Sequence, residues 1–199
     1  IHVGSLEENP FPETRFDLIS LNQVIEHIPE PAGLLMKLRE HLEDDGILIL
    51  SFPNVSSIYR CLFGRRWINW HVPYHTFHFN RKSFKTLCER NGWRVMRWKT
   101  VTPNLWTILQ LKSLTIRASI GNPSPLWFRA GPDISKKAEA SSSRFGARIS
   151  LVGRALRVLT IWVVEAAAML VNRFIDVLGM GDSLVMFIKP DNKAKSDLQ

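Results

Sequence analysis

The fold is decided by the stretch FDLISLNQVIEHIPEP, which runs from Phe16 to Pro31. It begins with an apolar run, Leu18 to Leu21, which is typical of a strand buried on both faces of a parallel sheet. Polar residues follow at once, beginning with Asn22 and Gln23. Because open α/β sheets bind their ligands at the carboxyl ends of the strands, these side chains are predicted to lie at a ligand-binding edge.

The residues that follow predict a strand–helix–strand unit. Apolar residues recur at helical spacing over residues 32–42, and Gly46 is expected to end that helix in the left-handed conformation. A second buried strand is expected over residues 47–52. Two strands joined through one helix by short links require a parallel sheet and a right-handed crossover.

The middle of the chain predicts an excursion and two further elements. Residues 55–79 are rich in aromatic residues, histidine and arginine without a clear period, which indicates an excursion or lid after the second strand. Asn80 is a favourable N-cap for a helix over residues 81–90. Residues 93–99 alternate apolar and basic side chains, as in a strand with one solvated face.

The later part predicts a helical insertion before a last strand at residues 183–189. Residues 104–120 and 149–178 are apolar and helical in pattern, and a Pro/Gly/Ser/Lys-rich loop is expected between them at 121–143. Arg154, Arg157 and Glu165 interrupt the apolar run. A packed or interfacial amphipathic helix is therefore favoured over a membrane-spanning one.

Charge is distributed unevenly along the 199 residues, whose net charge is +8. Residues 1–50 hold 3 basic and 10 acidic residues, whereas residues 51–199 hold 23 basic and 8 acidic ones. This split suggests a basic surface that faces an anionic partner, or simply a solvated basic face. Cys61 and Cys88 match neither a metal-binding spacing nor a disulfide framework.

These elements together resemble a known family. The order of motifs is similar to that of the class I S-adenosylmethionine-dependent methyltransferases, particularly those acting on small molecules such as sugars and quinone precursors. The resemblance implies an α/β, Rossmann-like sheet and S-adenosylmethionine as cofactor. The matching segments are residues 16–19, 25–31, 42–54, 79–93 and 181–185.

One departure from the family concerns the glycine-rich turn after the first strand and the acidic residue that ends the second. Neither is found here, so by the resemblance the chain begins at about the family's third strand. We expect an N-terminally truncated fragment, and the alternative is that another chain supplies these elements. We expect a partial methyltransferase domain at residues 1–103 and 179–190. Residues 104–178 are expected to form a lid or membrane-surface element, and residues 191–199 a polar tail.

The resemblance also assigns cofactor-binding residues. Asn22 matches the position that touches the adenosine or methionine portion, with Gln23 and Val24 beside it. Ser5 and Leu6 match the turn that approaches the adenine, although the family often has an acidic residue at the position of Ser5. The alternative role for Asn22 is a loop-capping amide.

His75 and His27 are the candidate catalytic residues, as a base for an acceptor hydroxyl or as an orienting group. Glu26, Trp70 and Tyr74 are expected to shape the substrate pocket. No metal site is predicted. Some quinone-precursor enzymes have a metal-binding carboxylate where this chain has Gln23, and an amide is a poorer ligand for a hard cation. His71, His75 and His78 have no carboxylate among them.

The favoured function is O-methylation of a small or lipid-linked acceptor by an enzyme located in the cytoplasm, with peripheral contact to an anionic membrane at its inner face. The alternative is a non-catalytic, membrane-peripheral or partner-binding module on a degenerate methyltransferase scaffold. Nucleic acid is not a favoured substrate, because no Asn/Asp-Pro-Pro-Tyr/Phe tetrad is present.

Overall fold

The computed structural model describes residues 11, 14–114 and 151–191. Its centre is a four-stranded sheet in the order β1-β2-β4-β3, formed by β1 (Phe16–Asn22), β2 (Leu42–Pro53), β3 (Trp93–Val101) and β4 (Ser183–Pro190). β1 and β2 are parallel, and β4 runs antiparallel to both of its neighbours. The helix α1 (Pro31–Glu40) connects the two parallel strands, so the predicted strand–helix–strand unit is confirmed.

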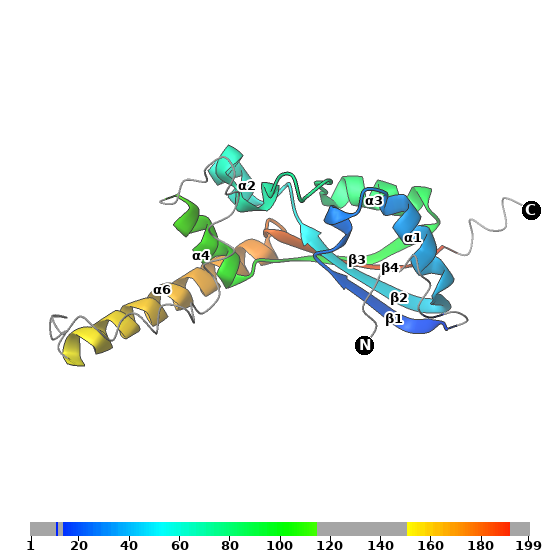
Figure 1. Ribbon diagram of the computed structural model, residues 1–199. Helices are drawn as coiled ribbons and strands as arrows, with labels where there is room; N and C mark the ends of the chain where they lie inside the picture. The colour runs from blue at the N-terminus through cyan, green and yellow to red at the C-terminus, as the bar shows by residue number, and fades with distance from the viewer. Residues whose placement is uncertain (1–10, 12–13, 115–150, 192–199) are drawn as a thin grey trace, which may run out of the picture.

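Two helices, α1 and α3 (Arg81–Arg90), cover one face of the sheet (Figure 1). The N-cap prediction for α3 is confirmed. The Asn80 side chain accepts from the backbone N–H of Ser83, and the Ser83 hydroxyl accepts from the backbone N–H of Asn80. The core beneath these helices consists of Ile25, Leu35, Leu38, Leu42, Leu48, Leu50, Phe52, Phe79, Phe84, Cys88, Trp93, Leu184, Met186 and Ile188.

β1 is not buried on both faces, so this part of the sequence prediction is wrong for the described chain. Ile19 and Leu21 pack against the core, whereas Leu18 points to the other face and is 56% exposed. No helix within residues 14–114 or 151–191 covers that second face in Figure 1. The apolar run of β1 therefore exceeds what the helix-covered face requires.

The predicted left-handed glycine cap at residue 46 is also wrong. α1 ends at Glu40, and Gly46 lies inside β2, outside the set of positive-φ residues. A Cβ atom at this position would lie 2.7 Å from Cγ of Leu42. Gly46 is thus required by lack of space beside Leu42, not by backbone conformation.

The excursion after β2 contains a short α-helix, α2 (Ile58–Phe63), and two 3-10 helices, η3 (Gly64–Arg66) and η4 (Ile68–Trp70). Two longer helices, α4 (Asn104–Ser113) and α6 (Leu151–Val177), lie between β3 and β4, and α6 projects away from the sheet in Figure 1. The loop predicted at 121–143 lies outside the described residues.

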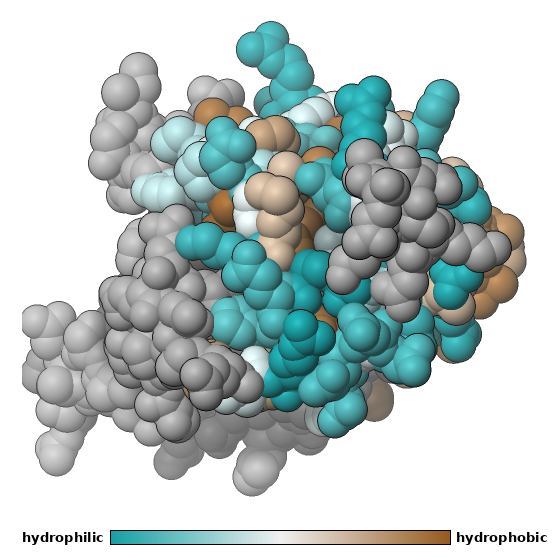
Figure 2. Space-filling model, turned by 90° about the vertical axis from the view of Figure 1, so that its right-hand side faces the viewer, coloured by the Kyte–Doolittle hydropathy of each residue, from teal (hydrophilic) through white to brown (hydrophobic). Residues whose placement is uncertain are grey.

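Polarity differs between the ends of the molecule. Seen from the end of the sheet away from α6, the described surface is mostly hydrophilic (Figure 2). α6 exposes large apolar side chains instead, among them Trp162, Leu170, Phe174 and Val177. Within the described ranges, none of the helices has the length and apolar character that crossing a bilayer demands.

Candidate active site

The carboxyl end of β1 delivers the first candidate residues. Oδ1 of Asn22 accepts a hydrogen bond from the hydroxyl of Ser51 on β2. Gln23 has φ +55°, and its backbone N–H donates to the Ser51 carbonyl at 2.9 Å. Its side-chain amide donates to the Ser183 hydroxyl at 3.2 Å. Asn22 therefore stays exposed at the strand end, whereas Gln23 ties β1 to β4.

The other predicted cofactor residues are only partly placed. Val24 is half-buried and immediately precedes the 3-10 turn η2 (Ile25–His27). Ser5 and Leu6 lie outside the described residues. Of the predicted cofactor set, the structure thus brings together Asn22, Gln23 and Val24 at one strand end.

Glu26, on η2, is the most unusual side chain of this region. It is 1% exposed, and neither carboxylate oxygen has a hydrogen-bond partner among the described residues. Burial raises the pKa of Glu26, and the charge of the adjacent His27 opposes this in part. Its backbone carbonyl accepts from the N–H groups of Thr76 at 2.9 Å and Phe77 at 3.2 Å, which fixes the end of the excursion against η2.

His27 and His75 meet beside this carboxylate. Nδ1 of His27 lies 2.9 Å from the carbonyl oxygen of Tyr74, and Nδ1 of His75 lies 2.8 Å from that of Asn69. A carbonyl can only accept, so each Nδ1 carries a proton and each Nε2 is left free of these two backbone contacts. The two ring centroids are 4.7 Å apart, and one ligand atom from each of Glu26, His27 and His75 lies within 4.8 Å of the others.

Burial lowers the pKa of His75 to about 4, and the hydrogen bond to Asn69 opposes this shift. His75 is therefore a neutral imidazole at pH 7. The pKa of His71, whose ring centroid lies 4.9 Å from that of His75, is lowered by burial as well. His71 belongs to this cluster of rings, although sequence reasoning gave it no catalytic or pocket role.

The two predicted aromatic pocket residues lie at different places. Tyr74 is half-exposed, its ring is 5.0 Å from that of His71, and its carbonyl holds His27. Trp70 packs on His78 at 4.9 Å and donates from Nε1 to the Gly64 carbonyl. Tyr74 thus borders the histidines directly, whereas Trp70 reaches His75 only through His78.

Sequence reasoning missed the support behind His75. Asp182, buried immediately before β4, accepts hydrogen bonds from Ser57 at 2.8 Å, Trp67 at 2.7 Å and Asn69 at 2.8 Å. Asn69 is the residue whose carbonyl holds His75. Burial raises the pKa of Asp182 to about 6 despite these donors. The only sequence signal was the position of Asp182 in the closing Gly181-Asp182 motif.

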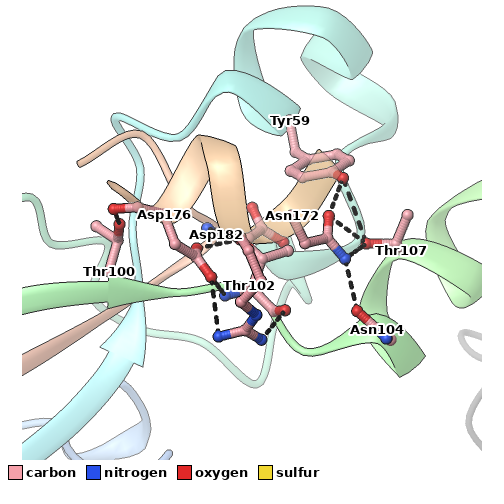
Figure 3. A network of polar contacts seen from close by, with 9 residues as sticks. Tyr59, Thr100, Thr102, Asn104, Thr107, Asn172, Asp176 and Asp182 are labelled. Carbon is pink, nitrogen blue, oxygen red and sulfur yellow. Dashed lines mark hydrogen bonds and ion pairs between the residues drawn. The ribbon is translucent and has the colours of Figure 1, made fainter. Parts of the chain in front are cut away.

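A second polar network joins the insertion to the sheet (Figure 3). Asn172 of α6 contacts Thr107 and Asn104 of α4 and accepts from the Tyr59 hydroxyl of α2 at 2.5 Å. Next to it, the side chain and carbonyl of Asp176 accept from Thr102 and Thr100 respectively. The base of α6 is therefore fixed to β3, α2 and α4 by buried and partly buried hydrogen bonds.

Comparison with known proteins identifies the domain that contains this site. A family model described as a methyltransferase domain matches residues 2–97. Residues 2–97 are a methyltransferase domain. The domain therefore includes β1, η2, α1, β2 and all three groups of the Glu26–His27–His75 cluster.

Solved structures give a weaker likeness. An S-adenosylmethionine-dependent methyltransferase from Archaeoglobus fulgidus is 14% identical with a TM-score of 0.46, and the match covers 95% of this chain and 66% of that one. A putative sarcosine dimethylglycine methyltransferase from Galdieria sulphuraria is 14% identical with a TM-score of 0.45, covering 95% and 58%. No curated protein sequence matches the chain. This chain thus spans less than two thirds of the length of either structure.

Proposed function

We propose that this chain is the part of an S-adenosylmethionine-dependent methyltransferase that receives the methyl acceptor, and that the acceptor atom is an oxygen of a small or lipid-linked molecule. The observation that carries the proposal is the pair of imidazoles, His27 and His75, at the carboxyl edge of a methyltransferase domain. His75 is neutral at pH 7 because burial lowers its pKa to about 4, so its Nε2 could accept the proton of an acceptor hydroxyl.

The described residues fit one portion of the cofactor. Asn22 is exposed at the strand end and its Oδ1 is engaged by Ser51, which leaves Nδ2 to donate to an oxygen of the cofactor. The side-chain amide of Gln23 donates to Ser183 and supports the turn instead. When bound, S-adenosylmethionine supplies an electrophilic methyl carbon on a sulfonium.

The residues of this chain would act on the acceptor. The cofactor held at Asn22 would supply the methyl group and leave as the thioether, and the residues around His75 would orient the acceptor hydroxyl. Nε2 of His75 would accept the hydroxyl proton, and the nearby Glu26 carboxylate would compensate the resulting imidazolium charge. Positioning supplies most of the rate in such a displacement, and the base adds to it.

Calorimetry and a methyl-transfer assay test this proposal with the full natural polypeptide. We expect binding of S-adenosylmethionine, and Asn22→Ala should weaken it about tenfold, the usual effect of losing one hydrogen bond to a charged ligand. Asn91→Ala, which removes an amide at the far end of α3, serves as the matched control. Absence of binding by the full polypeptide would refute the proposal.

We propose as a second point that α6 lies on an anionic lipid surface. Its side chains are apolar on several sides, with Trp162 67% and Val177 85% exposed. Such a helix is unstable in water unless another apolar phase covers it. The exposed η3 arginines, Arg65 and Arg66, lie beside α4, because Gln110 of α4 donates to the Arg66 carbonyl at 2.9 Å. Basic groups near an apolar helix favour anionic headgroups.

Vesicle sedimentation tests this second point. We expect the protein to sediment with vesicles that contain phosphatidylserine more than with purely zwitterionic ones. Leu170→Glu should abolish this enrichment, whereas Met36→Glu, an exposed apolar position on α1, should not. Equal sedimentation of the unaltered protein with both kinds of vesicle would contradict the proposal.

A further inference from the structure

A cavity of about 490 Å³ lies beside the first half of α3 and is also lined by β3, β4 and the residues that follow β2. Its basic lining residues are Arg81, Lys82 and Lys85, all on α3. Among the described residues that line it there is no carboxylate. Cavities of this size commonly hold small molecules, and a basic lining favours an anionic one.

The protein neutralises only one of these three charges. Nζ of Lys85 lies 3.3 Å from Oε1 of Glu89, whereas Arg81 and Lys82 have no acidic partner in the described part of the chain. Arg81 and Lys85 are four residues apart on α3, a spacing at which like charges destabilise a helix. An anion bound between these side chains would remove that repulsion.

The guanidinium of Arg81 is held in place by an aromatic ring. Its Cζ lies 4.2 Å from the ring centroid of Trp98. Trp98 packs in turn against Gly179, which has φ +72° and where a Cβ atom would lie only 3.1 Å from the ring. Stacking occupies the face of a guanidinium and leaves its N–H groups available. Arg81 can therefore donate two parallel hydrogen bonds to a phosphate.

We propose that this cavity binds a phosphate group, with Arg81, Lys82 and Lys85 as its cationic contacts. Ser56 also lines the cavity, and its backbone N–H donates to Oδ1 of Asn54 at 3.0 Å, so its exposed hydroxyl is positioned as a further donor. A phosphate group carries up to two negative charges and three acceptor oxygens, which matches several donors better than a carboxylate does.

The cavity and the histidine cluster lie on the same edge of the sheet. Asn54 follows β2, the cluster includes residues that follow β1, and these two strands are parallel. The backbone N–H of Phe77 donates to the Glu26 carbonyl at 3.2 Å, and Asn80 lines the cavity. Three extended residues span at most about 11 Å, so one phosphorylated molecule can reach both places. That this molecule is the methyl acceptor rests on the proposed function.

Calorimetric titration of the full natural polypeptide with inorganic pyrophosphate, at neutral pH and low salt, tests the cavity. We expect one site per chain. Arg81→Gln and Lys82→Gln should each weaken it about tenfold, the usual effect of losing one charge-assisted hydrogen bond. Lys85→Gln should weaken it less, because Lys85 shares its charge with Glu89. Arg90→Gln, at the other end of α3, is the matched control and should leave the affinity unchanged.

The indole ¹H–¹⁵N signals provide a second readout. Pyrophosphate should shift the signal of Trp98, assigned with Trp98→Phe, and leave that of Trp93, which is 1% exposed and outside the cavity lining, in place. Absence of a stoichiometric site, an unchanged Trp98 signal, or equal weakening by Arg90→Gln and Arg81→Gln would overturn the proposal.

Two further measurements separate this proposal from the proposed function and identify the source of the phosphate. Pyrophosphate should bind equally well to protein saturated with S-adenosylmethionine, and competition would place the cavity in the cofactor site and overturn the proposal. Binding of S-adenosylmethionine is also measured alone, so that failure of the proposed function is seen separately.

Vesicles that contain phosphatidic acid distinguish a lipid headgroup from a soluble ligand. At constant ionic strength, release of the unaltered protein from these vesicles by pyrophosphate would assign the cavity to a lipid phosphate. Sedimentation that pyrophosphate leaves unchanged would assign it to a soluble phosphorylated molecule.

Discussion

Two buried carboxylates of this chain differ in their surroundings. Asp182 is surrounded by donors, since Ser57, Trp67 and Asn69 all hydrogen-bond to its oxygens. Glu26 has no such donor among the described residues. Burial raises the pKa of both carboxyl groups.

The difference indicates a structural role for Asp182 and a role in ligand binding or catalysis for Glu26. A carboxylate with its hydrogen bonds satisfied holds the backbone in one arrangement, whereas an unsatisfied one costs stability and is retained where a ligand needs it. The two groups are also connected, because Asn69 links Asp182 to His75, which lies beside Glu26. Asp182 thus helps to position His75 next to Glu26.

The largest expected effect is a loss of stability on removal of the Asp182 carboxylate. Asp182→Ala leaves three buried donors without an acceptor, so the free energy of unfolding should fall by roughly 3–5 kcal/mol. Urea unfolding followed by circular dichroism measures it. Asp17→Ala, at an exposed position of β1, is the control and should change stability by less than about 0.5 kcal/mol. If the free energy of unfolding fell by less than about 1 kcal/mol in Asp182→Ala, Asp182 would not have the structural role that distinguishes it from Glu26.

The contribution of Asp182 to stability should also depend on pH. The pKa of Asp182 is raised from 3.8 to about 6, so the folded state holds the proton more tightly than the unfolded state. The contribution of Asp182 is thus fully present below about pH 4 and is lost as pH rises through 6, by about 3 kcal/mol for two pKa units. The stability difference between the unaltered protein and Asp182→Asn, measured from pH 4 to 7, should decline as pH rises. A difference that grows with pH would contradict this.

Substitution of His75 tests the proposed role of the Glu26–His27–His75 cluster in methyl transfer. His75→Gln should lower kcat for methyl transfer about a hundredfold, because it removes the nitrogen nearest the acceptor proton, and it should change stability little. His78→Gln, a loss of imidazole in the same ring cluster, should retain most of the activity. Retained activity of His75→Gln would remove His75 from the mechanism.

The smallest expected effect is a gain in stability on replacement of the Glu26 carboxylate. Glu26→Met replaces the unsatisfied carboxylate with an apolar side chain of similar size, which should raise the stability of the protein by about 1–2 kcal/mol. Glu40→Met, exposed at the end of α1, should have no such effect. Thermal unfolding measures both, and destabilisation by Glu26→Met would show that the carboxylate is satisfied in solution.

Local patterns predicted the elements well. The periodic leucines after Pro31, the Asn80 cap and the alternation from Trp93 each correspond to an observed element, because these signals act within a few residues. Burial of β1 was predicted less well. An apolar run such as Leu18 to Leu21 shows what a strand can bury, but not which of its faces another element covers.

The site was predicted in parts. Sequence patterns selected Glu26, His27 and His75 one by one, but their meeting depends on Glu26 holding Thr76 and on Asn69 holding His75. These are tertiary hydrogen bonds without a sequence period. The short turns of residues 55–79 likewise have no pattern to follow, which is why Asp182 was not recognised as their anchor.

The position of β4 has a consequence for how the protein is made. This strand is among the last described residues and yet lies between β2 and β3 in the sheet. During synthesis, β2 and β3 have no shared partner until residues 183–190 leave the ribosome, after α4 and α6 have been made. Closing a sheet over such a sequence separation is slow, so the nascent chain exposes strand edges for longer than a hairpin-built sheet would. A chaperone that protects the edges of β2 and β3 during this interval would raise the yield of folded protein.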